Sequence, residues 1–291
     1  MIRKISLILG LGVLSNLGMT QVLDPGQESP LDGVYSKSID TPHKKPVPYV
    51  QLREADIMWL QRVWRTVDMR EKVNHSFYFP LKPTQGRKNF MQVVMDAIAM
   101  ERIHAYASYD STEGGTQDYD DTFKLLLTAE EAKNALSFKE QIEGEDEFGD
   151  ATVEEIVSSI GLEEITSFRI KEEVFFDKQR SLMETRILGI APLIPDKVGG
   201  DESVMMEAFW IYFPEARFVF AEAEVYNRHN DVDRLTYEEL FWKRKFNSRI
   251  IKVSNVYDRS IDQYKSPMDA LLEAEKIEDE IFNREHDMWS F

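Results

Sequence analysis

The 291-residue chain contains no cysteine, and this absence removes several possibilities at once. Without cysteine the protein forms no disulfide and has no thiol nucleophile. It also lacks the residue to which bacterial lipoproteins attach their lipid. Its stability must therefore come from its own hydrophobic core or from partner proteins.

Basic residues are also scarce: 35 lysines and arginines stand against 52 aspartates and glutamates, a formal charge of −17. Phosphate backbones and anionic lipid heads repel so acidic a protein, which disfavours nucleic acid and bare membranes as partners. Basic proteins and divalent cations are more suitable. The composition, 43% hydrophobic and 30% charged, is that of a globular protein with one large domain or two small ones.

A long apolar run occurs only at the start of the chain. Residues 1–20, MIRKISLILGLGVLSNLGMT, begin with two basic residues and continue as an apolar stretch. This is the pattern of a signal peptide, and the stretch is shorter than the ~20 residues of a spanning helix. A buried core helix would not need the basic start. We therefore expect export, cleavage between Thr20 and Gln21, and no membrane-inserted segment in the exported protein.

Prolines gather in the next segment, which holds Pro25, Pro30, Pro42, Pro46 and Pro48. Proline fixes φ and removes a backbone donor, so residues 21–48 are predicted to form an extended arm. Two interpretations remain open: a flexible linker, or an arm that lies along a neighbouring subunit. The globular region is then residues 49–291, with a possible subdivision at residues 110–121.

The first part of the globular region is predicted to contain two helices, a strand and a loop. Apolar residues at 3-4-3 spacing predict a helix over residues 53–69, and an alternating run that ends in proline predicts a strand over residues 74–80. A second amphipathic helix is expected over residues 89–103, with Asn89 as its N-cap. The polar residues 109–121 are predicted to form a loop.

Two capping boxes, Thr128 with Glu131 and Thr152 with Glu155, predict two short helices, and the acidic run between them predicts a solvated loop. The remaining expected elements are a β-hairpin over residues 166–194 that turns at Lys178–Arg180, a strand over 204–213, a helix over 236–246, an extended run over 249–256 and a last helix opened by Ser266 and Pro267. Regular βαβ alternation is missing. The predicted fold class is therefore α+β, with mixed helices and antiparallel β-hairpins around one or two cores.

The sequence contains no recognisable catalytic or metal-binding motif. The five histidines lack metal-ligand spacing, and HExxH, GxSxG and P-loop patterns are missing, although distant residues could still assemble a triad in the fold. We expect no catalytic residue, no bound metal and no cofactor. The acidic sets lack EF-hand spacing, so solvated turns explain them better than calcium sites; they are Asp118/Asp120/Asp121, Glu143–Asp150 and Asn227/His229/Asp231/Asp233.

Residues 53–80, READIMWLQRVWRTVDMREKVNHSFYFP, pose the question of an active site or of packing. Large aromatic groups dominate cores and interfaces, whereas the lone His75 has no catalytic partner nearby in the sequence. Packing is the better explanation. Asn74-His75-Ser76 matches a glycosylation acceptor, but it adjoins an aromatic run that we expect to be buried, so we interpret it as a chance match.

Several sequence blocks in this order resemble one family. They are DIMWLQRVWRTVDMREKVN followed by FYFP and FMQVVMDAI, FFDKQRSLMETRILGIAPLIP at 175–195, WIYFPEAR at 210–217, FNSRIIKVSNVYDRSIDQY at 246–264, and the C-terminal ALLEAEKIEDEIFNREHDMWSF. Together they resemble the GldN/PorN family, the gliding-motility and type IX secretion proteins of Bacteroidetes-type bacteria. The resemblance covers most of residues 47–291, and the arm matches only in character.

The resemblance implies a non-enzymatic, periplasmic component of the secretion and gliding machinery. Family members join a GldK/PorK-type lipoprotein in large rings beneath the outer membrane and contact the periplasmic part of a GldM/PorM-type motor protein. The resemblance thus implies self-association and peripheral attachment to the outer membrane through the lipoprotein. The candidate partner-interface or packing residues are Pro46, Pro48, Tyr49, Trp59, Trp64, Phe77, Tyr78 and Trp289.

Two other function classes remain open from the sequence alone. A periplasmic hydrolase with dispersed acidic catalytic residues would show paired carboxyl groups of raised pKa in a cleft. A calcium-dependent binding module would become more stable when calcium binds its native state.

Overall fold

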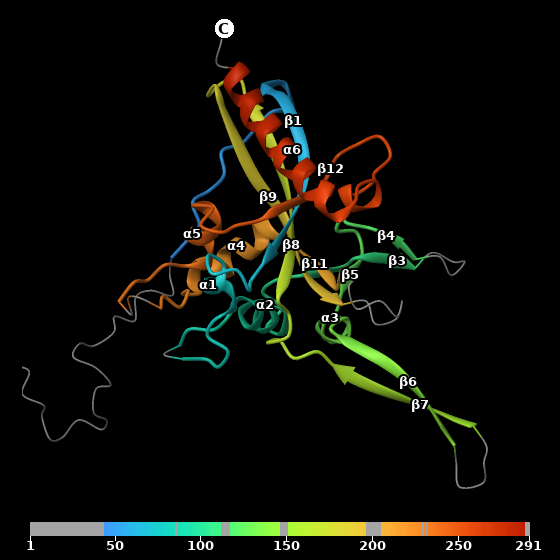
Figure 1. Cartoon of the computed structure of the whole chain (residues 1–291). Coiled ribbons are helices and arrows are strands. Elements are labelled where there is room, and N and C mark those ends of the chain that lie inside the picture. Colours follow the sequence, from blue (N-terminus) through green and yellow to red (C-terminus); the bar gives the residue numbers. More distant parts are fainter. Residues whose placement is uncertain are drawn as a thin grey trace, which may run out of the picture. The chain divides into compact units, whose positions relative to one another are not determined.

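The computed structural model describes residues 44–84, 86–111, 117–145, 151–195, 205–228, 230 and 232–288, which belong to one compact unit (Figure 1). Its centre is an antiparallel sheet packed against helices, so the predicted α+β class is confirmed. The strands follow the spatial order β12 (Arg249–Val253), β1 (Ile57–Asp68), β8 (Ser167–Asp177), β9 (Leu182–Pro195), β11 (Phe209–Tyr212), β2 (Ala105–Ala107) and β5 (Leu126–Leu127), and β10 (Met205–Glu207) pairs with β9. Two separate hairpins are formed by β3 (Tyr109–Ser111) with β4 (Gln117–Tyr119), and by β6 (Ser137–Glu145) with β7 (Ala151–Ser159).

The helices of the described chain pack in two groups. Short helices gather over the lower part of the sheet in Figure 1, whereas the last helix runs along β1 and β12. Their bounds are α1 (His75–Tyr78), α2 (Phe90–Ala99), α3 (Ala129–Asn134), α4 (Phe213–Glu222), α5 (Tyr237–Trp242) and α6 (Pro267–Met288), with 3₁₀ turns η2 (Glu54–Asp56) and η3 (Ile261–Gln263). No helix of the described residues combines the length and the hydrophobicity that crossing a bilayer would require.

The three long strands β1, β8 and β9 form the frame of the sheet. The predicted hairpin is confirmed: β8 pairs with β9 from Ser167 opposite Leu193 to Asp177 opposite Leu182, and the chain turns between them. Strand β1 pairs with β8 along its whole length. Side chains of alternate residues leave opposite faces of each strand, so this frame buries apolar groups on both sides.

Strand β1 overturns the helix expected over residues 53–69. Its apolar residues serve two cores, because Val63 lies in a cluster with α6 while Trp64 belongs to a second cluster, with Ile251 and Trp210. Burial on both faces removes the simple alternation that identifies a strand and produces a chance helical spacing. The branched and aromatic side chains of this segment favour a strand, and full-length pairing with β8 fixes it.

Residues 74–80 were predicted as a strand, and that prediction is wrong. They contain the single-turn helix α1, followed by a cis Phe79–Pro80 peptide. The turn is held by Asn74, whose side-chain nitrogen donates to the carbonyls of Asp68 at 2.7 Å and Asn247 at 3.0 Å. This long-range contact was not visible in the local pattern.

The second capping box also gave a wrong prediction. Thr128 and Glu131 form the expected reciprocal bonds and open α3, but Thr152 and Glu155 lie within β7, which pairs with β6 along its length. Alanine, glutamate and lysine favour the helix after Thr128, whereas valine and isoleucine favour the strand after Thr152. The loop expected over residues 109–121 is wrong at its two ends, because these residues include the paired strands β3 and β4; residues 112–116 lie outside the described chain.

The other expected elements are confirmed. Asn89 caps α2 through a capping box with Gln92, and the strand, helix and extended run expected after residue 204 correspond to β10–β11, α5 and β12. Ser266 accepts a weak bond of 3.4 Å from the amide of Asp269 at the start of α6. The predicted stripe of α6 faces the sheet, with Ala270 and Ala274 buried and Ile277 and Ile281 partly buried.

Candidate partner-binding surfaces

The described side chains do not assemble a metal centre. No group of three histidine, aspartate or glutamate residues in the described ranges is placed to hold a metal ion. Of the acids considered for calcium, Asp120 accepts bonds from the amide and hydroxyl of Thr122, and Asp121 pairs with Lys171 at 3.2 Å. These carboxylates are engaged by the fold, and residues 146–150, 229 and 231 lie outside the described chain.

Among the described carboxyl groups, every clear pKa shift is downward. In each case the largest cause is a hydrogen bond donated to the carboxylate: by Arg70 to Asp68, by Thr122 to Asp120, by Thr128 to Glu131, by Arg180 to Asp177 and by Lys243 to Glu239. A general acid in a hydrolase needs the opposite shift, a raised pKa. The observed shifts are those of structural ion pairs and caps.

Trp64 is a packing residue and is buried in the sheet. Its indole nitrogen donates to Asp121 at 2.8 Å, and the amino nitrogens of Lys171 and Lys252 lie 5.9 and 4.7 Å from its ring centroid. Burial lowers the pKa of Lys171, while the nearby Asp121 carboxylate opposes that shift. This cluster joins β1, β8 and β12 and stabilises the sheet from within.

Phe77 is fully buried at the centre of an aromatic core. Its ring centroid lies 5.2 Å from those of Phe168 and Phe241 and 5.6 Å from that of Phe90. The neighbouring Tyr78 is partly buried, and its hydroxyl donates to the carbonyl of Glu163. Asn74 is also fully buried, so the glycosylation sequence is inaccessible in the folded state, in agreement with a chance match.

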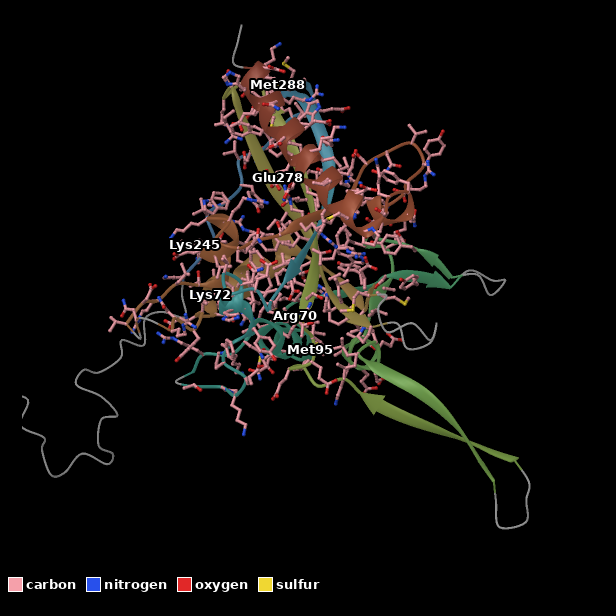
Figure 2. The ribbon with its side chains drawn as sticks, viewed as in Figure 1. Arg70, Lys72, Met95, Lys245, Glu278 and Met288 are labelled. Carbon is pink, nitrogen blue, oxygen red and sulfur yellow. The ribbon has the colours of Figure 1, made fainter. Side chains whose placement is uncertain are left out.

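A buried carboxylate connects α6 to the sheet. Glu172 of β8 has no exposed surface and accepts from Arg65 Nε at 2.5 Å and from Arg244 Nη1 at 2.8 Å. Arg65 also donates to Glu278 at 3.0 Å, and Glu278 lies midway along α6 (Figure 2). The network therefore ties together β1, β8, the segment after α5, and α6.

Tyr49 anchors the end of the predicted arm to the body of the same chain. Its ring stacks on Trp242 at 5.8 Å, and the guanidinium carbons of Arg217 and Arg186 lie 4.0 and 4.8 Å from its centroid. Burial is the largest cause of the raised pKa of the Tyr49 hydroxyl, and both arginines oppose it. A cavity of about 310 Å³ adjoins this cage.

Backbone contacts extend the anchor on both sides of Tyr49. Arg217 donates to the carbonyl of Val47 at 2.6 Å, and Arg186 donates to that of Val50 at 2.9 Å. Lys44 pairs with Glu239 at 3.1 Å. The segment from residue 44 to residue 50, which includes the partly buried Pro46 and the exposed Pro48, thus lies against α4, α5 and β9.

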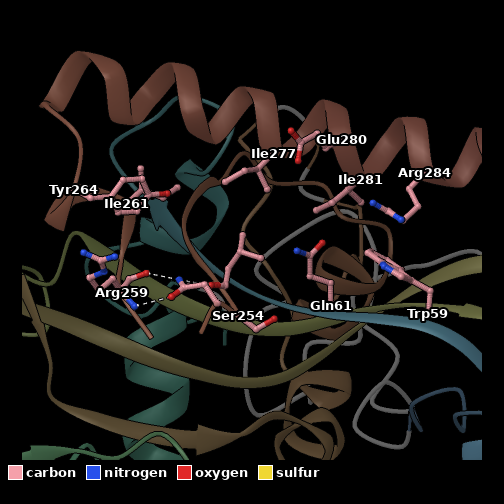
Figure 3. Close-up of a pocket in the computed structure, with 12 residues that line it drawn as sticks. Trp59, Gln61, Ser254, Arg259, Ile261, Tyr264, Ile277, Glu280, Ile281 and Arg284 are labelled. Carbon is pink, nitrogen blue, oxygen red and sulfur yellow. Dashed lines mark hydrogen bonds between the residues drawn. The ribbon is translucent and has the colours of Figure 1, made fainter. Parts of the chain in front are cut away.

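Trp59 lines a groove of about 220 Å³ between β1 and α6. Ile277, Ile281 and Arg284 point from the helix toward Trp59 and Gln61 on the strand (Figure 3), and the Arg284 guanidinium carbon lies 5.6 Å from the Trp59 ring centroid. The far end of the groove is formed by residues 253–264, where Asn255 bonds the backbone of Arg259. The groove combines apolar walls with both charge signs, a lining suited to a peptide side chain.

The two elements that form this groove also carry exposed apolar side chains. On β1, Met58 is 60% and Leu60 is 44% exposed. The outer face of α6, opposite its buried stripe, carries the further exposed residues Met268, Leu271, Leu272 and Phe282. Exposed apolar side chains on two neighbouring elements offer area for contacts with other proteins.

The predicted site residues thus fall into three groups. Trp64 and Phe77 are core residues; the partly buried or exposed residues are Pro46, Pro48, Tyr49, Trp59 and Tyr78, of which Tyr49 and Trp59 lie beside cavities; Thr20, Gln21 and Trp289 lie outside the described residues. Sequence reasoning missed Arg217 and Trp242, because only the fold brings them to Tyr49. Two features of the sequence could have indicated them: the single arginine of FPEAR, which is Arg217, and the tryptophan in the predicted helix over 236–246, which is Trp242.

These features define an α+β protein whose described surface offers grooves and apolar faces for protein contacts. Comparison with protein families then gives the particular assignment. The model of the family described as "Gliding motility associated protein GldN" matches residues 52–290, so the chain belongs to the GldN family and is associated with gliding motility and type IX secretion. No curated protein matches the chain at a significant level.

Proposed function

We propose that the protein is a non-enzymatic scaffold of the type IX secretion and gliding machinery. The observation that carries this proposal is the family match over residues 52–290. The open groove beside Trp59 and the exposed apolar residues of β1 and α6 support it, because a scaffold needs surfaces for several protein contacts.

In this proposal residues 1–20 direct export and are removed after Thr20, residues 21–48 are the arm, and residues 49–291 are the globular region. The protein lies in the periplasm and self-associates in a ring. A GldK/PorK-like lipoprotein holds it at the inner face of the outer membrane, and a GldM/PorM-like motor protein contacts the ring. Because residues 47 and 50 are bonded to the body of the same chain, we assign the contact with a neighbouring subunit to residues 21–43 of the arm.

Gene removal in the native bacterium, followed by titrated re-expression of the full chain, tests this function. We expect loss of gliding and of type IX secretion, and recovery only when the copy number approaches that of the envelope machines. An enzyme would restore function at a small fraction of that number, because each molecule acts many times. Normal gliding and secretion without the gene would contradict the proposal outright.

A further inference from the structure

One edge of the central sheet is open beside the groove. Strand β1 pairs with β8 from Ile57 to Asp68, but it pairs with β12 only from Val63 to Thr66. On this side, the part of β1 before Val63 has no neighbouring strand among the described residues.

The backbone of Leu60 is directed toward the open edge. The amide of Ser254 donates to the carbonyl of Arg62 at 3.0 Å, which shows that Arg62 points its polar groups to this side. In a strand the N–H and C=O of every second residue point the same way, so those of Leu60 do as well. Its donor and acceptor are thus available to an added strand.

The surroundings of this edge suit an inserted segment. A strand added beside β1 would direct alternate side chains into the groove beneath α6, next to Trp59 and Gln61 (Figure 3). Its other side chains would cover Leu60, which lies on the opposite face, and would come near the exposed Met58. Open edges with apolar side chains are normally covered in native proteins because they pair with other chains.

We propose that residues 31–41 of a second copy of this chain add as a strand to the open edge of β1. This inference rests on the proposed self-association and names the surface that would receive the arm. The segment reads LDGVYSKSIDT and lies between Pro30 and Pro42. It is the occupant that the sequence and the position of the anchor favour.

Proline content selects this part of the arm. An added strand must donate backbone N–H groups, which proline lacks. Every other proline-free run in residues 21–48 has four residues or fewer, whereas this one has eleven. Eleven extended residues span ~36 Å and the open edge needs only ~17 Å. Val34, Tyr35 and Ile39 also favour a strand.

The anchor lies at the opposite side of the same three strands. Residues 47–50 are held by Arg217 and by Arg186 of β9, and β8 separates β9 from β1. In each copy the arm therefore leaves the body beside β9, and the edge that would accept a neighbour's arm is at β1. Such a head-to-tail contact propagates in one direction and closes into a ring when the rotation between copies allows it.

Cysteine cross-linking tests the contact, because the chain has no cysteine of its own. Two differently tagged full-length copies are expressed together in the native bacterium, one with a single cysteine scanned over residues 33–38 and the other with Met58→Cys. A disulfide requires Cα atoms within ~7 Å. We expect an oxidised heterodimer that peaks at alternate arm positions. The matched control is Met100→Cys, directly after α2, which is also exposed and should give none.

A backbone variant separates strand addition from simple proximity. Leu60→Pro removes the N–H that points to the open edge, whereas Leu60→Thr keeps it. We expect the proline variant to lower the heterodimer yield at least tenfold and the threonine variant to leave it unchanged, with both showing the native circular dichroism spectrum. Equal yields in both variants, or equal cross-linking to Met58→Cys and Met100→Cys, would overturn the inference.

The same strains distinguish this inference from the proposed function. If envelope purification recovers a large assembly with its partners while no arm heterodimer forms, the arm acceptor is wrong and the scaffold proposal stands. If no assembly is recovered, both are wrong.

Discussion

Replacement of Glu172 by glutamine should strongly destabilise the fold. The substitution keeps the shape of the side chain but removes the negative charge that Arg65 and Arg244 share in the interior. Removing one partner of a buried ion pair costs ~3–5 kcal/mol, because the remaining charge is left uncompensated. Arg65 still pairs with Glu278 and Arg244 is partly exposed, so we expect the free energy of unfolding to fall by the lower end of this range, ~3 kcal/mol.

The next residue along β8 gives a matched control. Glu173 pairs with Arg62 at 2.5 Å on the other face of the sheet, and the arginine side chain is 40% exposed. Exposed pairs contribute up to ~1 kcal/mol, so Glu173→Gln should have a small effect. The two variants carry the same chemical change on adjacent residues and differ in burial.

Urea unfolding followed by tryptophan fluorescence measures the difference. With a slope of ~3 kcal/mol per molar urea, Glu172→Gln should lower the unfolding midpoint by ~1 M and Glu173→Gln by ~0.3 M or less. Equal shifts, or a shift below ~0.3 M for Glu172→Gln, would refute the reasoning that burial of this carboxylate ties α6 to the sheet.

Three further predictions concern single contacts. Asn74→Ala removes three hydrogen bonds, to Asp68 and Asn247, and should cost ~2–4 kcal/mol in urea unfolding; no measurable loss would contradict the role given to this buried amide. Arg180 stabilises the anionic form of the Asp177 carboxyl and so lowers its pKa below 3.8. Asp177→Asn should therefore be less stable than the parent at neutral pH, and this difference in stability should vanish as the pH falls through the lowered pKa. A difference that stays constant down to pH 2 would exclude this cause. Tyr49→Ala should speed tryptic cleavage after Lys44 without changing the global unfolding midpoint. Tyr49→Phe keeps the stack on Trp242 and should behave like the parent. Slow cleavage in Tyr49→Ala would show that the ring does not anchor the segment.

Local signals predicted those elements in which propensity, capping and packing agree. Asn89 with Gln92 and Thr128 with Glu131 start helices because helix-forming residues follow them. The β8–β9 hairpin combines two β-rich runs with a short polar turn. Family resemblance, carried by blocks spread along the chain, gave the assignment that the family match confirms.

The failures arose where distant contacts decide the structure. Trp64 and Val63 occupy opposite faces of β1. Because both faces of this strand are buried, the helical spacing of apolar residues over 53–69 arose by chance. Asn74 holds a helical turn through Asn247, and no local window contains both residues. The cage around Tyr49 joins residues up to 193 positions apart, which only the folded chain brings together.

Purification of the protein from its native envelope tests the central claim most directly. The full chain is tagged after its last residue, the envelope is gently solubilised, and mass spectrometry with electron microscopy identifies the partners and the particle. The scaffold account predicts a large ring that contains a lipoprotein in fixed ratio to this chain. A lone monomer that binds no partner at low or moderate salt would contradict it.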